Sequence, residues 1–516
     1  MKKIVFRVDG SSKMGAGHVM RCLSLAKALH KEGASCRFVC RAHLGHQMDR
    51  ISNAGFKVIA LPAPNSTFGA KECDGPALVH ESWIGSSWHH DAQETIEALA
   101  GDIVDWLVVD HYGLDHRWEH QLRSHAKRIM VIDDLANRKH DSDLLLDQNL
   151  VANLERRYDG LVPSHCVKLL GPKYVLLQPE YSDLHTRTPP RLGPVRCILV
   201  SFGGADLQNV NSMVIKAFLA LKRDDVQLDV VTNMGTSHFE ALRIQAKAHP
   251  KIQIHRAQPS LAPLMLQADL AIGASGTTSW ERCCLGLPAL VITSAENQQP
   301  IAEELHAQGL VRCLGNIHAV RAEDVIQALH EILEGNDLEQ WSRRCLKPVD
   351  GKGAERVVEI QSLNPATPLK ARLAQLKDEA LLLGWANDPF VRRSSFSSRT
   401  IDNETHRRWF YNRLREVARC KIYILETDRG LPIGQVRFEK KAGGWEVDFS
   451  LAQEARGVGL GRPLVKAAID ELLPTESGTK VYGRVKPDNL GSRKIFEHLG
   501  FSAKSIGAEI TFSRLL

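Results

Sequence analysis

The chain has 516 residues, of which 43% are hydrophobic and 24% are charged, a balance typical of globular proteins. Its length predicts about three folding units, because single domains cluster near roughly 100 to 200 residues. The net charge of +6 is small for this size and the basic residues are dispersed, which argues against nucleic acid as a partner and suits an anionic small substrate.

The sequence also bears on location and metal content. It contains no run of roughly 18 uncharged apolar residues, so it predicts neither a membrane span nor a membrane partner. The first residues reach charged Arg7 and Asp9 after a short apolar stretch, unlike a signal peptide. The 11 cysteines are unevenly spaced and include no CxxC pair, which disfavours a disulfide framework or a zinc site. We expect a cytoplasmic protein with reduced thiols and no metal.

The first part of the chain alternates short β-rich runs with helical stretches. The β-rich runs are residues 3–8, 35–40, 58–61, 106–110 and 129–133. This alternation predicts a parallel sheet with helices on both faces. A proline-rich segment, residues 186–194, then interrupts the pattern, and we interpret it as a hinge.

A second series of buried strands follows the hinge. Its predicted strands are residues 197–201, 226–232, 252–255, 270–273 and 289–293. The pattern breaks again near residues 362–368, and the runs beyond it resemble an antiparallel meander at 422–426, 433–439 and 445–450. We therefore predict two Rossmann-like α/β lobes that form a cleft, at residues 1–188 and 195–361, and an α+β domain at residues 368–516.

The loop after the first predicted strand has the composition of an anion site. Gly15 and Gly17 allow tight turns and close approach of an anion, and the helix that follows adds a favourable field for phosphate. His18 stands at the mouth of this loop, where an imidazole can take a proton from water near neutral pH. A histidine that only caps the helix or packs against it is the alternative.

Two loops of the second lobe lie where open α/β sheets bind ligands, beyond the carboxyl ends of strands. They are residues 201–206 (SFGGAD) and 273–281 (GASGTTSWE). The second loop ends at a helix start, which suits a diphosphate. Glu281, one turn into that helix, can accept both hydroxyls of a ribose, or can be a first-turn acid favoured by the helix dipole. Asn297 and Gln298 add polar contacts or belong to a solvated loop.

Together these motifs resemble a known enzyme family over residues 1–361. The motifs are residues 7–9 (RVD), 15–22 (GAGHVMRC), 110–112 (DHY), 132–134 (IDD), 201–206 and 274–278 (ASGTT). They are similar to the nucleotide-sugar hydrolases of pseudaminic acid synthesis. The resemblance implies a glycosyltransferase-B fold and inverting, metal-independent removal of UDP from UDP-2,4-diacetamido-2,4,6-trideoxy-β-L-altropyranose by water. It places the catalytic base at His18.

The remaining residues of this predicted site divide into two groups. Arg7, Arg21 and Asp110 orient the sugar or His18, or they form buried ion pairs of structural value only. The residues expected to bind the UDP-sugar are Asp9, Gly15, Gly17, Gly203, Gly204, Ser275, Gly276, Thr277, Thr278, Glu281, Asn297 and Gln298.

A glycine-rich loop near the C-terminus indicates a second activity. Residues 454–463 (EARGVGLGRP) follow a predicted strand and precede a helix, so successive backbone amides can wrap a pyrophosphate. This loop resembles that of the GNAT acetyltransferases, and so do three other segments, residues 384–392, 404–410 and 489–501. The resemblance covers residues 368–516 and implies acetyl-CoA as co-substrate. The residues expected to bind it are Arg456, Gly457, Val458, Gly459, Gly461, Asn489 and Ser492.

Acetyl transfer needs a route for removing a proton from the acceptor ammonium. Glu446 and Asp448 share one face of the preceding strand and are candidates for this role, although carboxylates that merely face solvent would look the same. Phe496 stands where many GNAT enzymes have a tyrosine, and phenylalanine has no proton to donate.

The two resemblances fit one pathway. We expect a bifunctional enzyme that acetylates the 4-amino group of a UDP-amino sugar and hydrolyses the diacetamido product. One alternative is a sugar-transferring glycosyltransferase fused to a protein N-acetyltransferase. The other is a regulatory protein that binds UDP-sugar or CoA through an inactive lobe. The sequence leaves the oligomeric state open.

Overall fold

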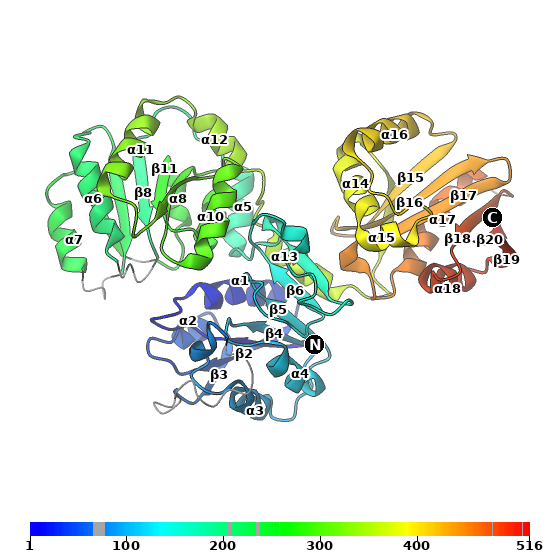
Figure 1. Cartoon of the computed structure of the whole chain (residues 1–516), viewed down its shortest axis with the longest axis horizontal. Helices are drawn as coiled ribbons and strands as arrows, with labels where there is room; N and C mark the ends of the chain where they lie inside the picture. Colours follow the sequence, from blue (N-terminus) through cyan, green and yellow to red (C-terminus); the bar gives the residue numbers. More distant parts are fainter. Residues whose placement is uncertain are drawn as a thin grey trace. The chain divides into compact units, whose positions relative to one another are not determined.

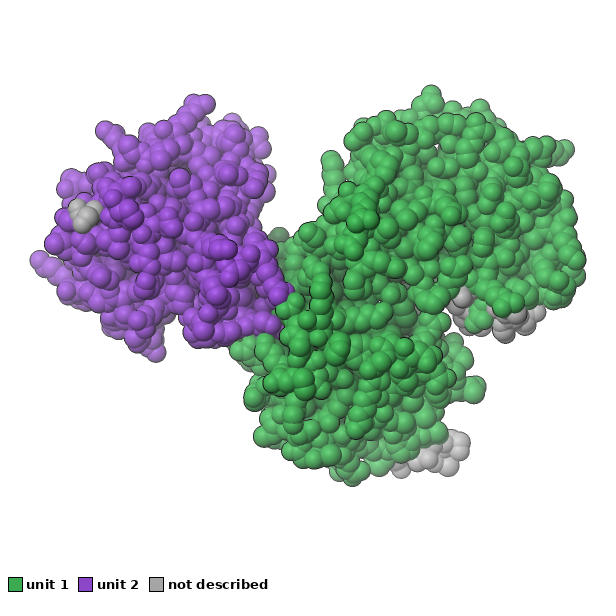
Figure 2. Space-filling view, turned by 180° about the vertical axis from the view of Figure 1, so that it is seen from behind, with its two compact units in different colours: residues 1–358 green, residues 359–516 purple. Residues whose placement is uncertain are grey.

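The computed structural model describes residues 1–64, 78–203, 206, 208–233, 238–256, 258–476, 478–507 and 509–516. The chain divides into two compact units, Met1–Val358 and Glu359–Leu516 (Figures 1 and 2). Among the described residues, no helix is long and apolar enough to cross a membrane.

The first sheet of unit 1 is parallel, in the order β3-β2-β1-β4-β5-β6-β7. Its strands are β1 (Lys3–Val8), β2 (Ser35–Arg41), β3 (Lys57–Leu61), β4 (Trp106–Asp110), β5 (Ile129–Ile132), β6 (Leu144–Asp147) and β7 (Val167–Leu170). The accompanying helices are α1 (Gly17–Lys31), α2 (Met48–Asn53), α3 (Trp88–Leu99), α4 (His116–Leu122) and α5 (Pro179–Arg187). The five strands predicted here are confirmed, and β6 and β7 were not predicted.

The second sheet of unit 1 is also parallel, in the order β10-β9-β8-β11-β12-β13. Its strands are β8 (Cys197–Ser201), β9 (Gln227–Thr232), β10 (Ile252–Arg256), β11 (Leu270–Gly273), β12 (Ala289–Thr293) and β13 (Arg312–Asn316). Its helices are α6 (Val210–Ala220), α7 (Phe239–Ala246), α8 (Ala262–Gln267), α9 (Thr277–Cys284), α10 (Gln299–Ala307), α11 (Ala322–Glu334) and α12 (Leu338–Cys345). A further helix, α13 (Gly353–Ser362), begins against Tyr174 and Val175, and the boundary between the two units falls within it.

Alternating side chains of the second sheet enter separate cores on its two faces. Leu199 and Ala271 pack with α8, α9 and α10, whereas Ile198 and Ile272 pack with α6, α7 and α11. Figure 1 shows the strands between these layers. Helices on both faces are therefore confirmed, and β-strands buried in this way expose only their ends to ligands.

Strand order reverses in both sheets of unit 1. The reversal falls between β1 and β4 in the first sheet and between β8 and β11 in the second. In open α/β sheets the loops after such neighbouring strands diverge and leave room for ligands. The three loops of unit 1 that were singled out in the sequence begin at these points, after β1, β8 and β11.

Unit 2 contains one mixed sheet in the order β14-β15-β16-β17-β18-β20-β19. Its strands are β14 (Leu369–Leu373), β15 (Cys420–Thr427), β16 (Pro432–Lys441), β17 (Gly444–Leu451), β18 (Lys480–Val485), β19 (Ser502–Ile506) and β20 (Glu509–Leu515). Its helices are α14 (Glu379–Asn387), α15 (Pro389–Ser394), α16 (Asn403–Arg415), α17 (Gly461–Glu476) and α18 (Leu490–His498).

The sheet of unit 2 also has a core on each face. One face carries Phe438, Trp445 and Phe512, which pack with α17 and α18. The opposite face of β15 packs with Trp385 of α14 and Phe410 of α16. The α+β architecture predicted for this part of the chain is confirmed.

The start of α13 supplies a test of packing in unit 1. A Cβ added to Gly353 would lie 2.6 Å from the backbone nitrogen of Val175, which a rigid turn cannot relieve. We expect Gly353→Ala to lower the free energy of unfolding by about 1 to 3 kcal/mol, measured by urea denaturation.

Gly384→Ala is the matched control for this substitution. Its Cβ would meet no described atom within 4 Å in the middle of α14, so it should stabilise its helix by up to about 1 kcal/mol. Equal urea midpoints for Gly353→Ala and the wild type would contradict the packing argument.

Candidate active sites

The loop between β1 and α1 places His18 at the carboxyl edge of the first sheet. Gly15 adopts φ +76°, a conformation that favours glycine, and its amide donates to the Ser11 carbonyl at 2.8 Å. The turn closed in this way lets α1 begin at Gly17. His18 therefore lies in the first turn of α1, with 8% of its surface exposed.

His18 is held by a buried carboxylate at the end of β4. Its Nδ1 lies 2.6 Å from Oδ1 of Asp110, and Arg21, one turn along α1, donates to both oxygens of Asp110 at 2.6 Å. Burial alone would raise the pKa of Asp110, but the charges of Arg21 and His18 outweigh it and lower that pKa well below its usual range.

The ionised state of Asp110 fixes the imidazole tautomer. A carboxylate only accepts hydrogen bonds, so Nδ1 of His18 carries the proton that bonds to Asp110. In the neutral ring Nε2 then carries the lone pair, and no described residue is hydrogen-bonded to it. This is the arrangement that a general base for water requires.

Aromatic rings fix the plane of the imidazole. The Tyr112 ring meets His18 edge to face, with centroids 4.5 Å apart. Trp83 lies beside Tyr112 at 5.6 Å and stacks on His80 at 4.6 Å. These contacts restrict rotation of His18 and reduce the orientations open to Nε2.

Asp9 lies beneath the loop. It is 1% exposed, its carboxylate pairs with Arg7 at 2.8 Å, and it accepts the backbone N–H of Arg41 at 2.6 Å. Its second oxygen faces His111 and His43 at 3.4 and 3.5 Å. The structure therefore gives Asp9 a supporting position, whereas the sequence suggested direct contact with ligand.

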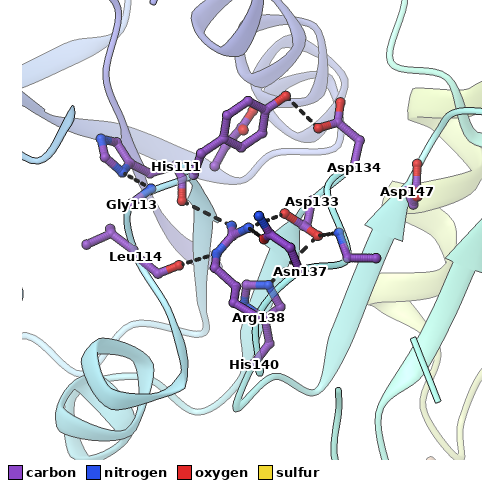
Figure 3. A network of polar contacts seen from close by, with 12 residues as sticks. His111, Gly113, Leu114, Asp133, Asp134, Asn137, Arg138, His140 and Asp147 are labelled. Carbon is purple, nitrogen blue, oxygen red and sulfur yellow. Dashed lines mark hydrogen bonds and ion pairs between the residues drawn. The ribbon is translucent and has the colours of Figure 1, made fainter. Parts of the chain in front are cut away.

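More acidic residues follow the neighbouring strands. Arg138 donates to Asp133 at 2.7 Å, and also to the carbonyls of Leu114 and His111 (Figure 3). Asp147, at the end of β6, is fully buried and accepts the Tyr158 hydroxyl at 3.1 Å. Burial, followed by the charge of Asp134, raises the pKa of Asp147 to about 7. A proton is therefore held inside the network near neutral pH.

The loop after β11 and the start of α9 form the second part of the candidate site. A side chain at Gly276 would enter space that no described atom occupies within 4 Å. Ser275 is fully buried, and its Oγ has no hydrogen-bond partner among the described residues. Thr277 and Thr278 begin α9, whose unpaired first-turn amides favour an anion.

Arg282 fixes the shape of this loop from below. It is buried and donates to the Ala274 carbonyl and to Ser279 Oγ, both at 2.8 Å. Glu281 is half-buried, and its surroundings raise its pKa to about 7, chiefly by desolvation. The carboxyl group is thus close to its ionisation point at neutral pH.

The other residues predicted for the nucleotide lie on neighbouring loops. Gly203, exposed at φ +82°, follows β8. Asn297 is exposed in the turn after β12, and Gln298 there accepts the Ser294 amide at 3.1 Å. Gly204 lies outside the described residues. The loops after three adjacent strands are thus gathered at one edge.

The candidate acetyl-CoA site of unit 2 lies where two parallel strands separate. Within the described residues, β17 and β18 pair only at Trp445 with Val481 and Glu446 with Tyr482. Beyond this point β17 pairs only with β16, which leaves backbone groups on its other side for a ligand. The predicted glycine-rich loop follows the end of β17.

Arg456 anchors this loop. Its guanidinium donates to the Leu451 carbonyl at 3.0 Å and pairs with Asp388 at 2.9 Å. Gly457 and Gly459 have φ of +74° and +83°, and half-buried Val458 lies between them. The structure therefore uses the Arg456 charge within the protein and leaves the loop amides to meet a ligand.

The helices after the loop position the remaining predicted residues. Gly461 is buried at the start of α17, against Ile495. Asn489 caps α18 by accepting the Ser492 amide at 3.1 Å. Phe496 is 2% exposed, with its ring 5.3 Å from Phe512. Asn489 and Phe496 thus have structural positions.

The two candidate bases of unit 2 differ in position. Glu446 is half-buried at the point where β17 and β18 separate, and it pairs with Arg484 at 2.7 Å. The Asp448 side chain is 56% exposed and pairs with Arg437 at 2.9 Å. Glu446 therefore has the better position to meet an acceptor amine at the separation.

Several residues of the candidate site in unit 1 were not predicted from the sequence. Tyr112, Asp134 and Trp280 lay within motifs that the sequence singled out but were not assigned to the site, and Asn149 was not considered. One signal was available, because three neighbouring strands each end on an acid or are directly followed by one, at Asp110, Asp133 and Asp147. The carboxyl ends of parallel strands meet at one edge, so these acids had to converge.

The raised pKa of Asp147 makes unit 1 sensitive to pH. The folded state holds this proton until pH about 7, so its stabilisation is complete below the ordinary pKa of aspartate and is lost as pH rises through 7. We expect Asp147→Asn to gain about 2 to 4 kcal/mol of stability relative to the wild type between pH 4 and 8. Urea denaturation across this range measures it, and a difference that stays constant with pH would contradict the assignment.

Comparison with known proteins agrees with the division into units. Residues 197–356 match the glycosyltransferase family 28 C-terminal domain, and residues 369–502 match the acetyltransferase (GNAT) domain. An uncharacterised protein of Methanocaldococcus jannaschii is 23% identical over 98% of this chain and 98% of its own length. The match therefore runs through both units.

Two further relatives concern unit 1. The UDP-2,4-diacetamido-2,4,6-trideoxy-β-L-altropyranose hydrolase of Campylobacter jejuni is 24% identical over 60% of this chain and 97% of its own length. The crystal structure of Acinetobacter baumannii MurG has a TM-score of 0.50 at 14% identity, over 70% of this chain and 99% of that one. The chain thus joins a part with a glycosyltransferase-B-like fold, which includes the match to the glycosyltransferase family 28 C-terminal domain, to a part that matches the acetyltransferase (GNAT) domain.

Proposed function

We propose that unit 1 hydrolyses a UDP-linked diacetamido sugar, UDP-2,4-diacetamido-2,4,6-trideoxy-β-L-altropyranose, to the free sugar and UDP. The observation that carries this proposal is the Nδ1 contact of His18 with ionised Asp110, at the edge of the sheet, which leaves Nε2 without a hydrogen-bond partner among the described residues. Similarity to the Campylobacter jejuni hydrolase supports the choice of substrate.

In the proposed reaction, Nε2 of His18 takes a proton from water while the water oxygen bonds to the anomeric carbon. The bond from that carbon to the β-phosphate oxygen breaks on the opposite face, so the configuration inverts and UDP leaves with the electron pair. Asp110 stabilises the imidazolium that forms, and Arg21 keeps Asp110 ionised.

The loop after β11 is proposed to hold the UDP. A departing diphosphate needs hydrogen-bond donors more than it needs a proton, and amides at Gly276, Thr277 and Thr278 supply them at the start of α9. The hydroxyl of Ser275 adds a donor that the described residues leave unused. Glu281 is proposed to accept the ribose hydroxyls.

Unit 2 is proposed to acetylate the 4-amino group of the UDP-amino sugar that precedes this substrate. The amine loses a proton to Glu446, directly or through water, and attacks the thioester carbon of acetyl-CoA. The carbon–sulfur bond breaks, the acetyl group passes to nitrogen, and CoA leaves as the thiolate. Amides of the loop at Gly457 and Gly459 are proposed to bind the pyrophosphate of CoA.

The two proposed reactions follow one another, because acetylation makes the diacetamido sugar that hydrolysis consumes. Carrying both activities on one chain raises the local concentration of the intermediate. The Methanocaldococcus jannaschii relative, which matches across both units, supports a joint role for them.

Sugar transfer is a second candidate function for unit 1. The match to the glycosyltransferase family 28 C-terminal domain favours it. The two functions differ in their need for an acceptor, because hydrolysis releases UDP and free sugar in water alone. UDP release that depends on an added sugar acceptor would favour transfer.

His18→Ala tests the base. We expect kcat for UDP release to fall by about 100- to 10,000-fold, with UDP affinity retained, because His18 acts on water and not on the nucleotide. Anomer-resolved NMR with the diacetamido UDP-sugar measures the product, and calorimetry measures UDP binding. His120→Ala, whose side chain is 83% exposed, is the control and should retain full activity. Full activity in His18→Ala would refute the mechanism.

Glu446→Gln and Asp448→Asn form a matched pair in unit 2. We expect Glu446→Gln to lower kcat for acetylation by about 100-fold or more, because it removes the proton acceptor at the strand separation. Asp448→Asn should change kcat little, because Asp448 is largely exposed. Thiol release from acetyl-CoA with the UDP-4-amino sugar measures both. Equal losses in the two variants would remove Glu446 from the proposed role.

A further inference from the structure

Asn149 connects the two halves of the candidate hydrolase site. It lies two residues after β6 and is 5% exposed. Its Nδ2 donates to Asp134 at 3.1 Å, and its Oδ1 accepts from the Trp280 indole at 2.9 Å. Both ends of the amide are thus bonded, one toward each half of the site.

One side of this connection leads to His18. The Asp134 oxygen bonded by Asn149 also accepts from Arg21 at 3.1 Å, and its other oxygen accepts the Tyr112 hydroxyl at 2.5 Å. Arg21 also donates a hydrogen bond to Asp110, which in turn accepts one from His18. These bonds are buried or part-buried, where hydrogen bonds to charged groups are stronger than in water.

The other side leads to the proposed nucleotide loop. Trp280 lies one turn beyond Thr277 in α9 and is fully buried among apolar side chains. Its ring fills the core, as a phenylalanine ring would in large part. Its indole N–H, however, bonds to the Asn149 amide. The polar atom of Trp280 therefore serves this connection.

We infer that Asn149 and Trp280 are positioning residues that hold His18 in register with the start of α9. This inference rests on the proposed function, in which α9 fixes the diphosphate and His18 directs water to the anomeric carbon. The angle and distance of attack then depend on the relative position of these two groups. A direct polar connection between them keeps that geometry constant.

Trp280→Phe removes the N–H and keeps most of the ring. We expect kcat to fall by about 10- to 100-fold, as for a displacement of about 1 Å in a reacting group, while KM and UDP affinity stay close to wild type. Trp341→Phe is the matched control, because the Trp341 indole also donates at 2.9 Å, to the Leu310 carbonyl, away from this connection. It should leave kcat unchanged.

NMR of the His18 imidazole supplies a readout that does not need turnover. The Nδ1–H signal, assigned by its loss in His18→Gln, reports the bond to Asp110. It should shift in Trp280→Phe, although Trp280 does not touch His18, and should stay in place in Trp341→Phe. Asn149→Asp keeps the acceptor for Trp280 but replaces the donor to Asp134 with an acceptor, and it should also shift the signal.

The outcomes separate this inference from the proposed function. A shifted His18 signal in Trp280→Phe supports the inference, whether or not the wild type hydrolyses the UDP-sugar. A wild type that fails to hydrolyse the UDP-sugar would refute only the proposed hydrolysis. An unchanged signal in both Trp280→Phe and Asn149→Asp, or a kcat for Trp280→Phe equal to that of Trp341→Phe, would overturn the inference. If Trp280→Phe and Asn149→Asp act on one connection, the double variant should be no less active than the less active of the two single variants.

Discussion

The pairing of Asp110 with Arg21 and His18 is the constraint on which the architecture of unit 1 depends. A carboxylate buried at the end of β4 is costly unless charge and hydrogen bonds compensate for it, and α1 supplies both from positions three residues apart. Helical geometry brings such residues to one face, so the start of α1 is fixed against β4. The turn at Gly15 provides that start. The same bonds that allow the charge to be buried also orient the imidazole.

In the glycine-rich loop of unit 2, residues 454–463, side chains and backbone also have separate roles. Arg456 directs its charge into the protein, toward the Leu451 carbonyl and Asp388, and the glycines on either side of Val458 turn the chain. In unit 1, Arg282 supports the loop before α9 from beneath. In both loops an arginine that bonds within the protein shapes the backbone, and the backbone amides are left to meet a ligand. Backbone amides do not titrate in the pH range in which proteins fold, so such loops can bind anions over a wide range of pH.

The sequence predicted the parts of this structure that local pattern determines. Buried runs such as Cys197–Ser201 and Leu270–Gly273 have the apolar content of central parallel strands and were found. Two edge strands of mixed composition were missed, Arg312–Asn316, which is half-buried throughout, and Leu369–Leu373. The internal strand Leu144–Asp147 was missed as well, although it is apolar and buried. Gly15 and Gly276 could be read from their motifs, and His18 with them. Asn149 and Trp280 are 131 residues apart, and only the docking of α9 against the segment after β6 makes them neighbours.

The same reasoning explains why charged residues alone were ambiguous guides to the sites. Asp9, Asp110 and Asp147 all end or follow strands of one sheet, yet their surroundings give them different states. Arg7 holds Asp9 ionised beneath the loop, and Arg21 holds Asp110 ionised beside His18. Burial, followed by the charge of Asp134, raises the pKa of Asp147 to about 7, and Arg157 opposes this rise only from 3.4 Å. The chemistry of each acid therefore depends on the groups that the fold brings to it. Asp9 has Arg7 and, at 3.4 and 3.5 Å, His111 and His43 beneath the loop, whereas Asp110 has Arg21 and a direct 2.6 Å contact with His18 in the first turn of α1.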